Sequence, residues 1–149
     1  MKTLITYFSA EETTKKIADQ VAKDCGIDVF EIVPKEPYTA ADIKWMNPVA
    51  RCNKEKLGNK DVPVEGKIEN FADYDTILIG FPIWYGGAPN VINTFCKGYD
   101  FTGKKVIAFA TSEGSPIGKT CEKLAPYVEG ASEVSAVLIH NEEELKGLL

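Results

Sequence analysis

The sequence predicts a three-layer α/β domain built around a mostly parallel sheet, and two observations support this. Short apolar runs flanked by Gly and Pro, of which residues 77–81 form the clearest, are typical of strands that are buried on both faces. Between these runs, apolar residues recur at helical spacing, so that strands and helices alternate along the chain. Ligands of such sheets bind beyond the carboxyl ends of the strands, which directs attention to the loops that follow them.

The N-terminal part of the chain predicts one strand–helix–strand unit with a right-handed crossover. Apolar residues at Ile17, Ala18, Val21 and Ala22 mark the inner face of its helix, and Gly26 supplies a stop. The expected elements are a strand over residues 2–8, a helix from Thr13 or Thr14 to Cys25, and a strand over 28–32 that Val33 and Pro34 end.

Residues 34–66 are the least regular part of the sequence. Thr39 is a candidate N-cap for a short helix with Asp42 at its third position, and Pro and Gly interrupt everything that follows. A segment of this length with little regular structure inside a compact domain is usually functional or packed by its own side chains. It also holds Trp45 and Arg51.

The second half of the chain continues the alternation of strands and helices. Pro89 suits the first position of a helix. His140 or Asn141 suits the cap of the last helix, and acidic residues follow that cap where the helix dipole favours them. The expected elements are strands over 76–81, 105–110 and 134–139, and helices over 89–97, 119–127 and 142–149, the second helix with Cys121, Leu124 and Ala125 facing inward.

The composition limits the class of protein. With 149 residues the chain is expected to form one domain, residues 1–149, whose core needs no disulfides. A net charge of −5 disfavours nucleic acid as a partner and fits docking onto basic proteins. No run approaches the roughly 18–20 apolar residues of a membrane span, and residues 1–8 are unlike a signal peptide. We therefore expect a cytoplasmic monomer or weak homodimer that does not bind membranes.

Cysteine and histidine usage predicts no metal site and no catalytic side chain. The four cysteines have wide, irregular spacings without a C-x-x-C pair. Cys25, Cys96 and Cys121 fall on or beside the apolar stripes of expected helices, which indicates reduced core thiols. The single histidine, His140, stands at a strand end and suits capping or exposure, so no Ser-His-Asp set is expected.

Three loops each follow a strand, precede a helix and are rich in Ser, Thr, Gly or aromatic residues, namely 9–14, 82–89 and 111–118. In the middle loop, Trp84 and Tyr85 stand beside Gly86 and Gly87, although a folded chain would rather bury such aromatics. A loop against which a flat aromatic ligand lies would carry them there. If the three loops meet at one edge of the sheet, they form one site.

Three motifs occur in this order: Tyr7-Phe-Ser9 with Thr14-Lys-Lys-Ile-Ala18, Pro82-Ile-Trp-Tyr-Gly86, and Ala110-Thr-Ser-Glu-Gly-Ser-Pro-Ile-Gly118. With them the chain resembles the flavodoxins, specifically their short bacterial group, over nearly its whole length. The piece Tyr38-Thr-Ala-Ala-Asp42 with Trp45 and Arg51 is similar to that group's insertion. The resemblance implies a three-layer flavodoxin-like fold, with a five-stranded parallel sheet of order 2-1-3-4-5. It also implies noncovalent FMN binding, for electron transfer or for reduction of small molecules such as quinones.

The resemblance also divides the roles among the loops. The first would hold the FMN phosphate with backbone N–H groups and hydroxyls at a helix N-terminus. The second would stack the flavin ring on Trp84, and the third would reach the pyrimidine or dimethylbenzene side of the ring. Alternatively, Ser9 and Thr13 only cap the helix, Trp84 is an ordinary aromatic, and the third loop is an ordinary turn. The expected cofactor-binding residues are Ser9, Glu11, Glu12, Thr13, Thr14, Pro82, Ile83, Trp84, Tyr85, Gly86, Thr111, Ser112, Glu113, Gly114 and Gly118.

Glu11 and Glu12 depart from the family's phosphate loop, which usually has Gly followed by Asn or Thr where this chain has Glu12 and Thr13. Either they stabilise a helix start by about 0.3–1 kcal/mol each, or they oppose the phosphate. A single charge about 6 Å from a dianion costs on the order of 1–1.5 kcal/mol in water-like surroundings. The electrostatic cost is several times larger for a buried charge. If the turn also needs a left-handed backbone at position 12, Glu there costs about 1–2 kcal/mol more than Gly would. Together the two costs come to roughly 2–4 kcal/mol, so we expect FMN affinity to be weakened about 30- to 1000-fold.

Two classes of function stay open on the sequence. The first is an FMN-dependent redox protein. Within it an electron carrier that meets redox partner proteins is favoured over an NAD(P)H/quinone-type reductase of a small-molecule acceptor, for which Trp45 and Arg51 could form a pocket wall. The second is a flavodoxin-fold binding or regulatory module that has lost FMN, which Glu11 and Glu12 favour and Trp84 opposes. The substitution Glu12→Gly separates the two classes.

Overall fold

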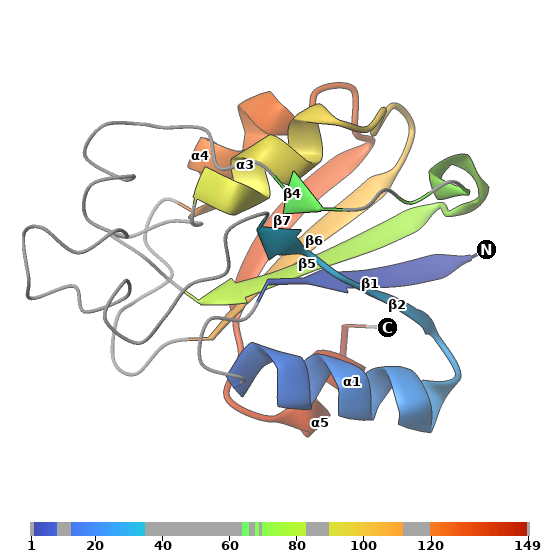
Figure 1. Ribbon diagram of the computed structural model, residues 1–149, viewed down its shortest axis with the longest axis vertical. Coiled ribbons are helices and arrows are strands. Elements are labelled where there is room, and N and C mark those ends of the chain that lie inside the picture. Colours follow the sequence, from blue (N-terminus) through green and yellow to red (C-terminus); the bar gives the residue numbers. More distant parts are fainter. Residues whose placement is uncertain are drawn as a thin grey trace, which may run out of the picture.

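A five-stranded sheet whose strands all run parallel forms the middle layer of the computed structural model (Figure 1). The structure describes residues 2–8, 13–34, 64–65, 68, 70–82, 90–111 and 120–148. The strands follow the order β2-β1-β5-β6-β7, which is 2-1-3-4-5 within this sheet, so the predicted order is confirmed. The strands are β1 (Thr3–Tyr7), β2 (Asp28–Glu31), β5 (Thr76–Pro82), β6 (Lys105–Thr111) and β7 (Glu133–Leu138).

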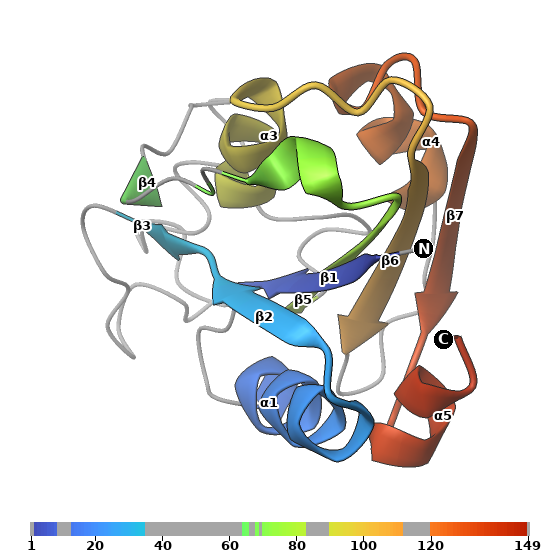
Figure 2. The same cartoon turned by 90° about the vertical axis from the view of Figure 1, so that its right-hand side faces the viewer.

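Helices cover both faces of the sheet and complete the three predicted layers (Figure 2). On one face lie α1 (Thr13–Cys25) and α5 (Glu142–Lys146), and on the other lie α3 (Asn90–Lys97) and α4 (Thr120–Leu124). This arrangement follows from the parallel strands, because each crossover connection has to pass over a face of the sheet.

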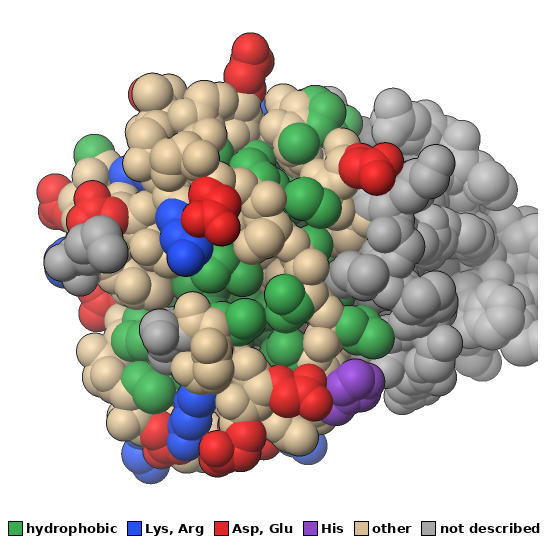
Figure 3. Space-filling model, turned by 180° about the vertical axis from the view of Figure 1, so that it is seen from behind, with side chains coloured by type: hydrophobic (Ala, Val, Ile, Leu, Met, Phe, Trp, Pro, Cys, Tyr) green, Lys and Arg blue, Asp and Glu red, His purple; other side chains and the backbone are tan. Residues whose placement is uncertain are grey.

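The central strands are buried because both of their faces are covered. Leu78 and Phe109 pack with Ile17 on the α1 side, and Ile79 packs with Val91 on the α3 side. Strands β1, β5 and β6 are buried at nearly every position, whereas the edge strand β7 is half-buried along most of its length. Figure 3 looks onto the side of the molecule where β7 lies and shows apolar side chains gathered in the middle of that face.

A small antiparallel pair was not predicted. Strand β3 (Val33–Pro34) pairs with β4 (Val64–Glu65), with Val33 opposite Glu65. Pro34 therefore lies in a strand instead of only ending one. A two-residue edge pair tolerates proline because it requires few backbone N–H donors.

The predicted helix over 119–127 is divided in the structure. Helix α4 ends at Leu124, and a 3₁₀ turn (Ala125–Tyr127) continues the chain. Pro126 gives the physical reason, because proline has no N–H to donate and its ring clashes with the carbonyl four residues earlier. Of the residues expected to face inward, Leu124 is buried, while Cys121 and Ala125 are only half-buried.

The ends of the two helices on the other face follow the sequence signals. Gly26 ends α1 in the left-handed conformation, at φ +66°. Asn141 caps α5, its side-chain oxygen accepting the Glu144 N–H at 3.0 Å. His140 is exposed, and its backbone N–H donates to the Glu144 carboxylate at 2.8 Å. Helix α5 ends at Lys146, before the expected end at residue 149.

The cysteines in the described part of the chain are all free thiols, but they are not all in the core. Cys96 is buried, and burial raises the pKa of its thiol, which makes it unreactive. Cys25 is exposed, so the prediction of a core thiol is wrong there. The apolar stripe of α1 is buried only as far as Ala22, and Cys25 follows it in the exposed last turn.

Some expectations concern residues outside the described part of the chain. These are the short helix from Thr39, Trp45 with Arg51, Cys52, and Pro89 at the start of α3. Within the described part, no helix is both long enough and apolar enough to cross a membrane.

Candidate functional site

The carboxyl ends of three neighbouring strands meet at one edge of the sheet. Tyr7 of β1 lies opposite Gly80 of β5, and Pro82 at the end of β5 lies opposite Thr111 at the end of β6. The Phe8 N–H donates to the Gly80 carbonyl at 2.8 Å, which extends the contact between β1 and β5 past the strand end. The three predicted loops therefore begin at neighbouring strand ends, as one site requires.

A buried hydrogen bond joins the first of these loops to the third. The hydroxyl oxygens of Thr14, in the first turn of α1, and Thr111, at the end of β6, lie 2.8 Å apart. Thr14 is 1% exposed and Thr111 is 6% exposed. Ninety-seven residues separate the two in sequence, so this contact fixes the helix start against a strand that the chain reaches much later.

The predicted cofactor residues are only partly covered by the structure. Thr14 and Thr111 are brought into contact, Pro82 is half-buried at the end of β5, and Thr13 is the first residue of α1. Their proposed roles toward a ligand stay predictions. The predicted residues outside the described part are Ser9, Glu11, Glu12, Ile83, Trp84, Tyr85, Gly86, Ser112, Glu113, Gly114 and Gly118.

We expect the Thr14–Thr111 bond to show as strong non-additivity in unfolding experiments. Thr14→Val or Thr111→Val alone leaves a buried hydroxyl without its partner and should cost about 1–3 kcal/mol. The double substitution replaces both hydroxyls by methyl groups of the same shape and should cost no more than either single one. Urea unfolding of the four proteins measures the coupling. Additive losses would mean that the two hydroxyls do not depend on each other.

A row of aromatic side chains with a glycine in its middle crosses the sheet under α1. Tyr7, Gly80 and Phe109 are neighbours in β1, β5 and β6. A Cβ on Gly80 would lie 2.2 Å from Cζ of Phe109 and 2.3 Å from its Cε2. The Phe109 ring therefore fills the space that a side chain at position 80 would occupy. The sequence marks Gly80 only as a break in an apolar run, so this contact was missed.

Charged groups surround the hydroxyl of Tyr7 at the same end of the sheet. Lys15 Nζ lies 3.4 Å from the Tyr7 oxygen, 3.1 Å from Glu31 Oε1 and 3.8 Å from Asp19 Oδ2. Burial, aided by a hydrogen bond to Asp19 and the charge of Glu31, raises the pKa of Tyr7 to about 12, so the phenol stays protonated. The hydrogen bond to Glu31, followed by that to Tyr7, raises the pKa of Lys15.

The start of α1 suits an anionic group better than a metal. The first turn of α1 carries no acidic residue and contains the exposed Lys16. The unpaired N–H groups of a helix start attract phosphate. No group of three His, Cys, Asp or Glu that could hold a metal ion occurs in the described ranges. The neutral hydroxyls and the helix N-terminus at this edge are thus compatible with a phosphorylated ligand.

Comparison with known proteins agrees with this architecture. A family model described as Flavodoxin matches residues 2–146. A protein of Bacteroides eggerthii assigned as a flavoprotein is 36% identical, with a TM-score of 0.89 over 99% of this chain and 95% of its own. A similar protein of Bacteroides uniformis is 38% identical, with a TM-score of 0.85 over 99% and 96% of the two chains.

A flavoprotein of Lactobacillus acidophilus, solved in complex with FMN, is 25% identical, with a TM-score of 0.75 over 98% of this chain and 97% of its own. No curated protein matches the sequence. The family match spans nearly the whole chain, and the observed strand order is the one that the resemblance implied. The chain therefore belongs to the flavodoxin family.

Proposed function

We propose that this protein binds FMN noncovalently at the carboxyl edge of its sheet and serves as an electron carrier between redox partner proteins. The observation that carries the proposal is the Thr14–Thr111 bond, which joins the end of the expected phosphate loop, residues 9–14, to the start of the third loop, residues 111–118. The Lactobacillus acidophilus relative, solved with FMN, supports the choice of flavin.

Different residues at this edge would bind the phosphate and the ring of FMN. The N–H groups of the first turn of α1 would hold the phosphate, because the helix dipole favours negative charge there. Trp84 would stack on the flavin ring. FMN itself would supply the redox chemistry, and the protein would orient the ring and limit its contact with water.

A titration of purified protein with FMN tests the proposal. Flavin fluorescence and tryptophan fluorescence are followed together, and we expect mutual quenching with one-to-one stoichiometry. The two tryptophans allow a matched control, because Trp45→Phe leaves Trp84 as the reporter and Trp84→Phe leaves Trp45. Quenching should survive in the first variant and weaken strongly in the second.

Two results would count against this function. Absence of quenching at about tens of micromolar FMN would rule out FMN as the cofactor and favour a binding module. This concentration allows for the weakened FMN affinity that Glu11 and Glu12 predict. Sustained oxidation of NAD(P)H by the FMN-loaded protein with a quinone would favour a reductase over a carrier. A carrier should instead pass electrons from a flavoprotein reductase to a second protein without oxidising NAD(P)H itself.

A further inference from the structure

The first turn of α1 is fastened to the sheet at two points. Thr14 bonds to Thr111 of β6, and Lys15, the next residue, reaches toward β1 and β2. Lys15 Nζ donates to Glu31 at 3.1 Å and to the Tyr7 hydroxyl at 3.4 Å. Tyr7 and Glu31 lie opposite each other at the ends of neighbouring strands, so Lys15 ties the helix start to both.

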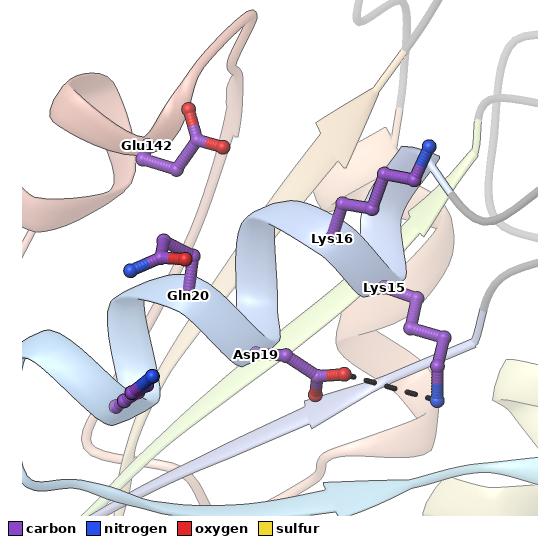
Figure 4. Close-up of a pocket in the computed structure, with 6 residues that line it drawn as sticks. Lys15, Lys16, Asp19, Gln20 and Glu142 are labelled. Atoms are coloured by element: carbon purple, nitrogen blue, oxygen red, sulfur yellow. Dashed lines mark ion pairs between the residues drawn. The ribbon is translucent and has the colours of Figure 1, made fainter.

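The charge of Lys15 is already neutralised within this cluster. Figure 4 shows Lys15 and Asp19 turned toward each other on α1, with a dashed line for their ion pair. The Lys15 Nζ and Asp19 Oδ2 atoms lie 3.8 Å apart. With Glu31 at 3.1 Å as well, one ammonium faces two carboxylates. An ammonium paired in this way offers little net attraction to a phosphate, because the carboxylates cancel its field at a distance.

We propose that Lys15 is a positioning residue for FMN: held by Glu31 and Tyr7, it fixes the first turn of α1 so that the N–H groups there meet the phosphate. This rests on the FMN binding proposed above. A turn that spends only part of its time in the binding arrangement lowers the apparent affinity by that fraction. Tyr7 is only 2% exposed, so the hydroxyl that Lys15 contacts belongs to a side chain held in the core.

Solvent exposure of the Lys15–Glu31 pair limits how much its loss can weaken FMN binding. The side chains of Lys15 and Glu31 are each 40% exposed, and ion pairs of this kind are weak in water. We therefore expect a three- to fivefold loss of FMN affinity when the contact is removed, about the upper range for such a pair.

Paired titrations with FMN and riboflavin test the proposal, because riboflavin has the same ring but no phosphate. Lys15→Met and Glu31→Gln should each raise the Kd for FMN about three- to fivefold and leave the Kd for riboflavin unchanged. Lys15→Arg should restore FMN binding. Lys146→Met is the matched control, since Lys146 pairs with Asp24 at the same 3.1 Å near the far end of α1. It should change neither Kd.

The Glu31→Gln variant separates positioning from direct attraction. It removes one of the two carboxylates that neutralise Lys15. If FMN then bound more tightly, Lys15 would be attracting the phosphate directly, and the proposal would be overturned. Equal weakening of FMN and riboflavin would also overturn it, in favour of a general loss of structure. Amide hydrogen exchange of residues 17–19, whose N–H groups donate to the carbonyls of the first turn in an α-helix, should be faster in ligand-free Lys15→Met than in ligand-free Lys146→Met. This readout distinguishes failure of the positioning contact from failure of FMN binding as such.

Discussion

Replacing Gly80 by Ala is expected to lower the free energy of unfolding by about 3 kcal/mol or more, at the upper end of overpacking effects. The new Cβ would lie 2.2 Å and 2.3 Å from the distal ring atoms of Phe109, far inside contact distance. Phe109 is fully buried between the sheet and α1, so its ring has no free space to enter. Urea unfolding measures the loss, and thermal unfolding should show a decrease in Tm of about 6–12 °C.

A second substitution identifies the clash as the cause. Phe109→Leu removes the ring atoms that the Cβ would meet and should cost about 1–2 kcal/mol alone. Gly80→Ala with Phe109→Leu should then be more stable than the sum of the two losses predicts. Gly147→Ala is the matched control, because Gly147 has φ −63° and a Cβ there would lie 3.4 Å from its nearest neighbour. A small loss for Gly80→Ala would show that β5 and β6 adjust without strain.

The sequence predicted the sheet well because buried parallel strands leave a strong local signal. Apolar runs such as 77–81 and the periodic residues of α1 determine which segments are strands and which are helices. The strand order came from the family resemblance, since local patterns do not specify which strands are neighbours. The errors arose where the same local pattern is compatible with two different structures. Pro126 divides a helix that the apolar spacing alone would continue, and the stripe that includes Cys25 extends past the covered part of α1.

The candidate site was predicted less completely, because its contacts join residues that are distant in the chain. The family resemblance implied a phosphate role for the loop that contains Thr14, but only the structure shows its hydroxyl against Thr111. Lys15 has no role of its own in the sequence motif, and only the structure places it beside Glu31 and Tyr7. A residue type predicts which chemistry is available, whereas the partner of that residue depends on the strand register.

The substitution Glu12→Gly is expected to lower the Kd for FMN by about tenfold or more. Removing the carboxylate ends a repulsion on the order of 1–1.5 kcal/mol toward the phosphate dianion. If the loop needs a left-handed residue at position 12, glycine also removes about 1–2 kcal/mol of backbone strain. Each 1.4 kcal/mol corresponds to a factor of ten in Kd. Flavin fluorescence titration of both proteins at low and high salt measures the change.

Two further variants divide the effect between charge and backbone. Glu12→Gln removes the charge but not the strain, so its gain in FMN affinity should be smaller than that of Glu12→Gly and should shrink at high ionic strength. Glu11→Gln measures the neighbouring charge alone. None of the three should change the affinity for riboflavin, which lacks the phosphate. An unchanged Kd for FMN in Glu12→Gly would mean that no phosphate lies near this loop, and the regulatory module without FMN would then become the better account of the protein.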